Sequence, residues 1–373
     1  MRVLVLSDLF WPYIGGPEVL AAALLPKLRE RGHEFLVVTS HDYLELPDEA
    51  THRGIPIQRL PLRAALDERD FAGLRAAREA VAERKRAYAP DLVHAIGVGP
   101  SLFFHLRTAE AHPAPWVIWL QNELLASQSE GQDTLLLEVM RSADWVAACS
   151  EPVLGQARRV APEIATRSSV IRNAVEVAPD PPEDLPPVPR LLCLGRLVPA
   201  KGFDVALTAF AALAPRFPSL RLTIAGDGAA RGELERQAAS LEIDDQVDFL
   251  GWVDPDRVPA LIDEATVVVM PSRREGLPVA AAQAASRARP IVASRVGGLP
   301  EVVAHDQSGM LVEPEDARGL AQAVAYMLDH PGDAARMGRA AHARVRKALS
   351  LDRCVDAFDH LYRTLTRRHK WSA

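Results

Sequence analysis

The 373-residue sequence predicts an α/β protein of two domains, each built on a mainly parallel sheet. The chain is too long for one comfortable hydrophobic core, so two domains are the default expectation. Short apolar runs alternate with amphipathic runs in both halves, which is the pattern of βαβ units. Between the halves, residues 178–189 contain six prolines, which predicts a stiff, extended linker. The expected architecture is therefore two Rossmann-like domains that face each other across a cleft, with a ligand between the carboxyl ends of their sheets.

The first domain, residues 1–180, is expected to hold five strands and two helices. The strands are predicted at residues 2–7, 34–39, 92–96, 116–120 and 145–148, and the helices at 18–31 and 72–87. Gly32 directly follows the first helix and is expected to be its C-cap.

The second domain, residues 186–350, repeats the alternation. Strands are predicted at 191–195, 221–225, 248–250, 267–269 and 290–294, and helices at 203–214 and 230–241. The amphipathic C-terminal segment, residues 353–373, is expected to be a helix that packs back on the first domain.

Composition excludes several classes of protein. The net charge of −6 gives no sign of a nucleic-acid partner. The three cysteines are scattered among apolar residues, so buried thiols in a reducing compartment are expected. No apolar run approaches the roughly 18 residues of a membrane span, and the N-terminal run is too short for a signal peptide. We therefore expect a cytoplasmic protein, or one that is peripheral at the inner membrane surface.

The most informative segment follows the predicted strand that ends at Met270. Pro271 stops this strand, a glycine-bearing loop follows, and Pro278 opens an Ala-rich helix. A strand, a tight loop and a helix N-terminus together present backbone N–H groups to an anion. Glu275 lies in this loop, and Gln283 lies eight positions further on. A carboxylate beside a phosphate cradle suggests a ligand with both phosphate and hydroxyl groups, such as a sugar nucleotide.

Two further loops could contribute to an anion site. Arg196 and Lys201 follow the first strand of the second half, where a forked guanidinium and an ammonium suit a diphosphate. Alone, an Arg and a Lys at such positions are more often solvated surface charges; beside the loop after Pro271, the binding interpretation is favoured. Gly15 and Gly16 allow close backbone approach to a ligand at a helix N-terminus, or merely form a tight turn.

Other motifs favour structural roles. Asp254 and Asp256 could resemble a metal-binding pair, but they precede a helical pattern and are expected to cap it. No metal site is predicted. His33 and His94 lie at strand edges and are expected to be core or edge residues. The basic run 84–86 is expected to be a solvated helix end, with contact to an anionic lipid surface as the minority alternative.

Many short motifs, in order along nearly the whole chain, carry a resemblance to a known family. They are Gly15-Gly16, 31–33, 90–94, 143–144, 150–151, 170–173, Gly195-Arg196, Lys201-Gly202, 226–228, 249–251, Pro271-Ser272, Glu275-Gly276 and 297–301. In this set the chain resembles a retaining glycosyltransferase of the GT-B fold and of family 4.

The resemblance implies a division of roles in the site. Arg196 and Lys201 would hold the donor diphosphate and stabilise the charge that develops as it leaves. Glu275 would bind hydroxyls of the transferred sugar. The implied donor-binding residues are Gly15, Gly16, Val253, Gly276, Leu277, Pro278, Val279 and Gln283. Neither a metal ion nor another cofactor is implied.

Three positions depart from the family pattern. Gln283 stands where the family has a second Glu, so one ribose hydroxyl contact would lose its charge. Gln121, followed by Asn122, stands where the family has an active-site His; both are expected to line the active-site cleft on the acceptor side. Ala288 replaces a small residue that is usually Gly.

The favoured function is transfer of a hexose-type sugar, with retention, from a nucleotide diphosphate to an unidentified acceptor. UDP is the favoured nucleotide and GDP the alternative. The acceptor could be a small molecule, a glycan or a lipid-linked sugar, chosen by the loops at 11–13, 63–71 and 122–132. Gln121 and Gln283 motivate a second hypothesis, a weakly active or inactive relative that binds sugar or nucleotide as a subunit. A third is a GT-B enzyme of other chemistry, a phosphorylase or a disaccharide synthase.

Overall fold

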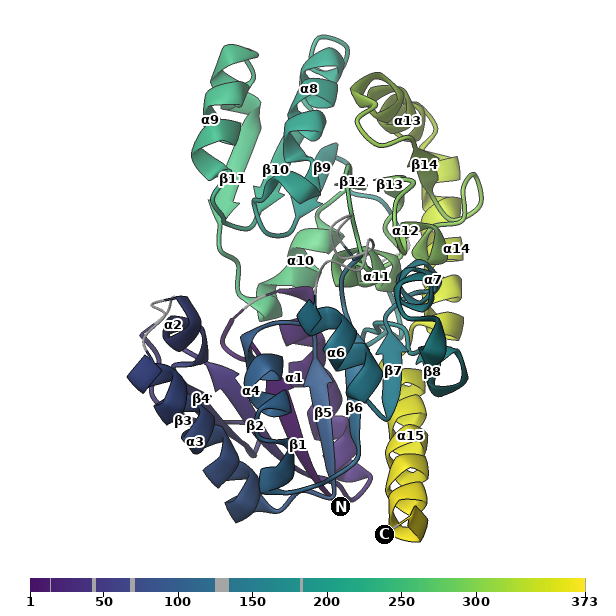
Figure 1. The fold of residues 1–373 in the computed structure, drawn as a ribbon. Helices are drawn as coiled ribbons and strands as arrows, with labels where there is room; N and C mark the ends of the chain where they lie inside the picture. The colour runs from purple at the N-terminus through teal and green to yellow at the C-terminus, as the bar shows by residue number, and fades with distance from the viewer. Residues whose placement is uncertain (14, 42–44, 68–70, 125–133, 182–183, 373) are drawn as a thin grey trace. The chain divides into compact units, whose positions relative to one another are not determined.

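The computed structural model describes residues 1–13, 15–41, 45–67, 71–124, 134–181 and 184–372 (Figure 1). The chain forms two compact units. The first contains Met1–Arg172 and Asp352–Ala373, and the second contains Asn173–Leu351. The boundary therefore lies at Arg172, and the proline-rich stretch at 178–189 belongs to the second unit.

The first unit is built on an eight-stranded sheet of order β3-β4-β2-β1-β5-β6-β7-β8. Its strands are β1 (Arg2–Ser7), β2 (Glu34–Ser40), β3 (Glu49–His52), β4 (Ile55–Leu60), β5 (Leu92–Ile96), β6 (Trp116–Leu120), β7 (Trp145–Ala148) and β8 (Ser168–Val170). Neighbouring strands pair in parallel except β3 and β4, which are antiparallel. The five strands predicted from the sequence are all present, and the parallel sheet is confirmed.

Helices flank this sheet. They are α1 (Gly16–Glu30), α2 (Leu62–Asp67), α3 (Phe71–Tyr88), α4 (Pro100–Leu106), α6 (Thr134–Ser142), α7 (Glu151–Val160) and α15 (Leu351–Ser372). Arg31 is the C-cap of α1, and Gly32 is the next residue, with φ of 88°. Glycine is favoured there because a left-handed residue commonly ends a helix at that position.

The last helix, α15, is fixed to the first unit by side chains that point from it to the sheet. Nδ1 of His94 on β5 lies 2.6 Å from the Tyr362 hydroxyl, and Nε2 of His33 lies 2.7 Å from Oδ1 of Asp359. His94 is fully buried, and this burial lowers its pKa to about 3, so the ring is neutral at physiological pH. Both histidines are therefore packing residues, as predicted.

Lys85 on α3 corrects one expectation. The run 84–86 was expected to be solvated, but the Lys85 side chain is buried and donates hydrogen bonds of 3.0 Å to the carbonyls of His105 and Thr108. Its neighbour Arg86 is exposed and pairs with Glu79. Burial lowers the pKa of the Lys85 ammonium to about 7. Lys85 thus joins α3 to the end of α4.

The second unit is built on a six-stranded, wholly parallel sheet of order β11-β10-β9-β12-β13-β14. Its strands are β9 (Arg190–Leu194), β10 (Arg221–Ala225), β11 (Val247–Gly251), β12 (Val267–Met270), β13 (Ile291–Ser294) and β14 (Met310–Val312). Its helices are α8 (Phe203–Leu213), α9 (Arg231–Ser240), α10 (Val258–Asp263), α11 (Val279–Ser286), α12 (Leu299–Val302), α13 (Ala317–Asp329) and α14 (Pro331–Ala348).

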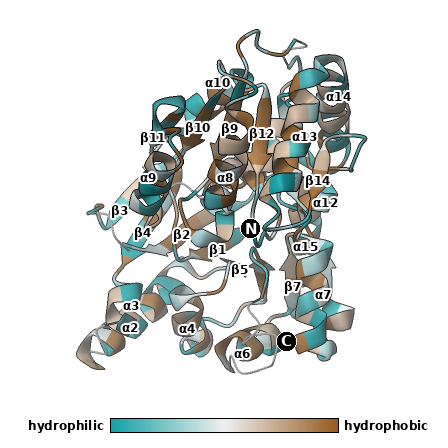
Figure 2. Cartoon of the chain, turned by 90° about the horizontal axis from the view of Figure 1, so that it is seen from above, coloured by the Kyte–Doolittle hydropathy of each residue, from teal (hydrophilic) through white to brown (hydrophobic). Residues whose placement is uncertain are grey.

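Apolar burial stabilises this unit. Leu, Val, Ala and Phe side chains of α8, α9 and α13 pack with side chains of the strands in one buried cluster. Figure 2 shows β9, β10 and β12 in the brown of hydrophobic residues, whereas α9 and α14 carry teal, hydrophilic residues. Among the described residues, no helix is both long and apolar enough to cross a membrane.

Candidate functional site

The strand order of the second unit creates a topological switch point. From β9, the chain adds β10 and β11 on one side and β12, β13 and β14 on the other. Loops at the carboxyl ends of the two strands beside such a switch diverge, and ligands of open α/β sheets bind there. The loop after β9 carries Arg196 and Lys201, and the loop after β12 carries Glu275. The predicted cations and carboxylate therefore belong to the two loops that flank this point.

Lys201 and Glu275 are in direct contact. Nζ of Lys201 donates to Oε1 of Glu275 over 2.7 Å, and the Ser272 hydroxyl donates to the same oxygen over 2.7 Å. Glu275 is 7% exposed and Lys201 is half-buried. A carboxylate with two donors on one oxygen is held in a fixed orientation, which leaves Oε2 for a further donor.

The two loops are packed closely enough to require glycine. Gly202 has φ of 65°, and a Cβ at this position would lie 2.0 Å from the carbonyl oxygen of Pro271. The backbone N–H of Arg273 also donates to the carbonyl of Ala200 over 2.9 Å. Glycine is thus required at position 202 because its backbone is left-handed and because the loop after β12 approaches it closely.

The N-terminus of α11 completes this part of the site. Pro278 is the N-cap, and the first N–H groups of the helix have no acceptor within it. The preceding carbonyls are occupied: Gly298 N–H donates to Gly276, and the Asn173 side-chain amide donates to Leu277, each over 2.9 Å. These contacts fix a loop whose helix N-terminus favours an anion. The role of Asn173 was not anticipated, although it lies in one of the motifs at 170–173.

Three other predicted residues lie at the same edge of this sheet without joining that contact. Arg196 is exposed, and its side chain makes no hydrogen bond or ion pair with any described residue. Val253 is partly exposed in the loop after β11. Gln283 lies half-buried in the second turn of α11, and its side-chain amide has no described hydrogen-bond partner.

The remaining predicted residues belong to the first unit. Gly15 is the N-cap of α1 and Gly16 is its first residue. Gln121 follows β6 and is 5% exposed, and neither atom of its side-chain amide has a hydrogen-bond partner among the described residues. Asn122 is exposed. Of the loops predicted to choose the acceptor, residues 68–70 and 125–132 lie outside the described residues.

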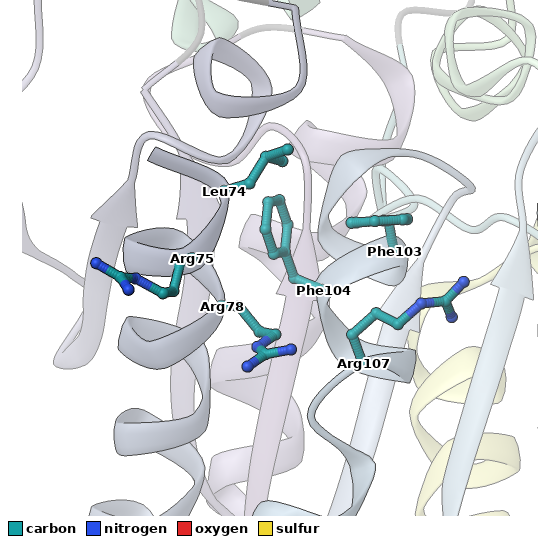
Figure 3. A pocket seen from close by; sticks show the side chains of 6 residues that line it. All are labelled: Leu74, Arg75, Arg78, Phe103, Phe104 and Arg107. Carbon is teal, nitrogen blue, oxygen red and sulfur yellow. The ribbon is translucent and has the colours of Figure 1, made fainter. Parts of the chain in front are cut away.

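A separate cavity lies between α3 and α4 of the first unit (Figure 3). Its volume is about 360 Å³, and it is lined by Leu74, Arg75, Arg78, Phe103, Phe104 and Arg107. Arg107 is already engaged, since it pairs with Glu138 at 2.8 Å and lies 5.1 Å from the centre of the Phe103 ring. None of the residues predicted for the site lines this cavity.

The two aspartates considered for a metal have a structural role. The Asp254 carboxylate accepts from the backbone N–H of Asp256 over 2.9 Å and caps the turn before α10, as the capping interpretation predicted. In the described part of the chain, no three His, Cys, Asp or Glu residues are grouped so as to hold a metal ion. The three cysteines are buried, as predicted, and burial raises the pKa of the Cys193 thiol to about 12.

Comparison with known families matches both halves of the chain. The model for glycosyl transferases group 1 matches residues 183–344. The model for glycosyltransferase family 4 matches residues 14–179. The two matches share no residue and adjoin near the proline-rich stretch. Together they account for nearly the whole chain.

Individual proteins also resemble this chain in sequence or in fold. The glycogen synthase of Mycobacterium tuberculosis is 34% identical over 212 residues, which are 56% of this chain and 51% of that protein. The chain thus spans about half the length of this curated relative. Among solved structures, sucrose-phosphate synthase from Thermosynechococcus elongatus superposes with a TM-score of 0.84 at 21% identity, over 99% of this chain and 100% of that one. The Anabaena protein HepE in complex with UDP-glucose superposes with a TM-score of 0.82 at 20% identity, over 98% and 100% of the two chains. These likenesses confirm the predicted fold class.

Proposed function

We propose that this chain, which belongs to the group 1, family 4 glycosyltransferases, transfers a hexose-type sugar from a nucleotide diphosphate to an acceptor hydroxyl. The transfer retains the anomeric configuration. The observation that carries the proposal is the bond between Lys201 and Glu275 at the switch point, beside the N-terminus of α11. Cation, carboxylate and helix N-terminus are the three groups that a sugar diphosphate would engage.

Each group has a distinct task in this proposal. The Lys201 ammonium and the exposed Arg196 guanidinium bind the diphosphate oxygens. The second oxygen of Glu275 accepts from a hydroxyl of the sugar, which orients the anomeric carbon. The amides of Leu277, Val279 and Ala280 donate to oxygens of the sugar or phosphate, whereas Pro278 has no N–H to donate. Val253 and the half-buried Gln283 contact the nucleoside, with Gln283 at the ribose.

The chemical step needs charge stabilisation more than a strong base. The bond between the anomeric carbon and the phosphate oxygen breaks, and the acceptor oxygen bonds to the same face of that carbon. The departing diphosphate takes up the acceptor's proton. Preorganised donors aimed at developing charge are commonly worth a few kcal/mol each. In this scheme Arg196, Lys201 and the helix N-terminus supply the positive potential, and no metal ion or other cofactor takes part.

UDP is the favoured nucleotide. In its support, HepE, which superposes over almost all of this chain, is described in complex with UDP-glucose. GDP is the alternative. The acceptor, a small molecule, a glycan or a lipid-linked sugar, would be bound from the first unit, where Gln121 presents an amide without a described partner. A cytoplasmic enzyme, or one peripheral at the inner membrane surface, would meet all three acceptor classes.

A donor panel tests the proposal. The protein is incubated with UDP-, GDP- and ADP-sugars and a broad acceptor mixture, with and without EDTA, and nucleotide release and the anomeric configuration of the product are measured. We expect release from one nucleotide class, unaffected by EDTA, and an α-linked product from an α-linked donor. Release that EDTA abolishes would contradict the metal-independent scheme, and an inverted product would contradict retention.

A second candidate function is a nucleotide-sugar-binding subunit with little activity, which Gln121 and Gln283 favour because each replaces an ionisable residue of the family. Calorimetric titration with UDP, GDP and ADP separates the two candidates. Binding without release from any donor would support the subunit, whereas binding with release supports the enzyme.

A further inference from the structure

Arg273 stands two residues before Glu275, yet its side chain is directed at other elements. The guanidinium donates to both carboxylate oxygens of Asp204, from Nη1 over 2.8 Å and from Nη2 over 2.6 Å. It also donates to both oxygens of Glu315, from Nη2 over 3.0 Å and from Nε. A planar fork that engages two carboxylates in this way has little orientational freedom left.

The same residue holds the turn that carries Lys201. Nη1 of Arg273 donates to the Pro199 carbonyl over 2.6 Å, and its backbone N–H donates to the Ala200 carbonyl over 2.9 Å. Asp204 lies in the first turn of α8, three residues after Lys201. Arg273 therefore binds the chain on both sides of Lys201.

The second carboxylate, that of Glu315, connects the segment before α13 to Arg273. Glu315 has φ of 65°, a left-handed conformation that is unfavourable for a residue with a Cβ. Asp316, the next residue, is the N-cap of α13 and accepts from Gly319 N–H over 2.8 Å. Such backbone strain persists only where the surroundings enforce it, and the fork of Arg273 is one such contact.

We propose that Arg273 is a positioning residue, which sets the Lys201 turn against the loop of Glu275 so that ammonium and carboxylate meet a sugar-nucleotide donor in fixed geometry. The inference rests on the proposed function for its ligand. The contacts of Arg273 with Asp204 and Glu315 engage its guanidinium away from the Lys201–Glu275 bond, so its effect on the reaction is transmitted through the backbone at Ala200 and Lys201. A misplacement of about 1 Å at a reacting site can cost about 100-fold in rate.

Neighbouring Arg274 offers a matched control. It has the same charge and is exposed, and its side chain makes no hydrogen bond or ion pair with a described residue. If Arg273 acted only by adding positive charge near the donor, Arg273→Lys would preserve its effect, and Arg274→Met would have a comparable one. A positioning role instead requires the fork, which Lys lacks.

The experiment compares Arg273→Met, Arg273→Lys and Arg274→Met with the wild type in two measurements. The first is hydrogen exchange of the peptide that contains residues 199–205, which needs no activity. The second is kcat and KM for the donor that the wild type accepts. We expect both Arg273 variants to exchange at least about tenfold faster in this peptide and to lose about tenfold or more in kcat, with a smaller change in KM, because only interactions tighter in the transition state change kcat.

Arg274→Met is expected to stay within about twofold of the wild type in both measurements, since exposed, unpaired charges contribute little. Unchanged exchange in Arg273→Met, a rise in KM alone, or wild-type behaviour of Arg273→Lys would overturn the proposal. If Arg273→Met does not fold, Glu315→Gln, which weakens one arm of the fork, receives the same measurements. If the wild type releases nucleotide from no donor, the proposed function fails, whereas the exchange comparison still decides whether Arg273 holds the turn.

Discussion

Lys201 and Glu275 share one hydrogen bond of 2.7 Å across two loops that are 74 residues apart in the sequence. Glu275 is nearly inaccessible to water, so its carboxylate depends on Lys201 and Ser272 for its hydrogen bonds. The pair stabilises the two loops, and in the proposed reaction both side chains also contact the donor. Stability and activity should therefore respond differently to the same substitutions.

The first prediction separates these two roles. Lys201→Met leaves a buried carboxylate with one donor fewer and should lower the free energy of unfolding by about 1–3 kcal/mol. Adding Glu275→Gln removes the unpaired charge and should restore part of that stability, while kcat/KM stays at least about 100-fold below the wild type. Urea denaturation and donor kinetics on the two single variants and the double variant check this. A double variant that is less stable than both single variants would contradict the coupling.

The second prediction concerns Gln283, whose amide has no described partner. Gln283→Glu should bind UDP about fivefold more tightly, because charge-assisted hydrogen bonds are roughly twice as strong as neutral ones. Gln283→Met, which keeps the side-chain length but cannot form hydrogen bonds, should bind more weakly than the wild type. Calorimetric titration with UDP measures both. Equal affinities in all three proteins would show that residue 283 does not contact the nucleotide.

The third prediction tests the close approach of the two loops. Gly202 and Gly32 both have positive φ, but only at Gly202 would a Cβ meet another backbone atom, the Pro271 carbonyl oxygen at 2.0 Å. Gly32→Ala should cost about 1–2 kcal/mol from backbone strain alone. Gly202→Ala should cost more, because the β9 and β12 loops must separate as well. Denaturant unfolding measures the loss in the free energy of unfolding for both variants. Equal losses would show that the two loops separate at no energetic cost.

The fourth prediction is a pH dependence set by Lys85. Its pKa is about 7 in the folded protein against 10.5 as the ordinary value, so between these two pH values the unfolded chain binds more protons than the folded one. The stability of the wild type relative to Lys85→Met should therefore rise with pH across that window, by up to about 1.4 kcal/mol per pH unit, and stay flat below it. The exposed Lys347, replaced by Met, is the control and should show no such trend. Urea denaturation at several pH values decides the matter, and a flat difference for Lys85→Met would show that its amine stays charged.

The parallel strands of the core were predictable because buried strands are short apolar runs that are easily recognised in the sequence. β6 and β7 are apolar runs between polar stretches, and their predicted bounds agree with the structure. β3 was not predicted, because its residues are exposed or half-buried and alternate without an apolar face. The short helix α12 has only four residues, which is too few to show a helical period.

The site residues that could be predicted are those whose role is recognisable from their immediate neighbours in the sequence. Glu275, Lys201 and the Pro278 cap are read from neighbouring residues, and the structure places them on adjoining loops. The bonds of Arg273 to Asp204 and Glu315, and of Asn173 to Leu277, join residues that are 42 to 104 positions apart. Such pairings depend on the strand order, which the sequence pattern alone does not specify. Lys85 was misread for a similar reason, because its two carbonyl partners come from the end of another helix.

The docking of α15 on the first unit has a consequence for the topology of the whole chain. The polypeptide leaves that unit after Arg172 and re-enters it at Asp352, so the second unit is an insertion within the first. Its entering and leaving segments are bonded to each other, since Val175 N–H donates to Leu349 and Leu351 N–H donates to Val175. A protease cut in either connection would leave the two units covalently joined through the other. The unit with the Lys201–Glu275 pair is thus one continuous segment whose two ends are adjacent. Residues 173–351 are therefore the segment to transplant or to express alone.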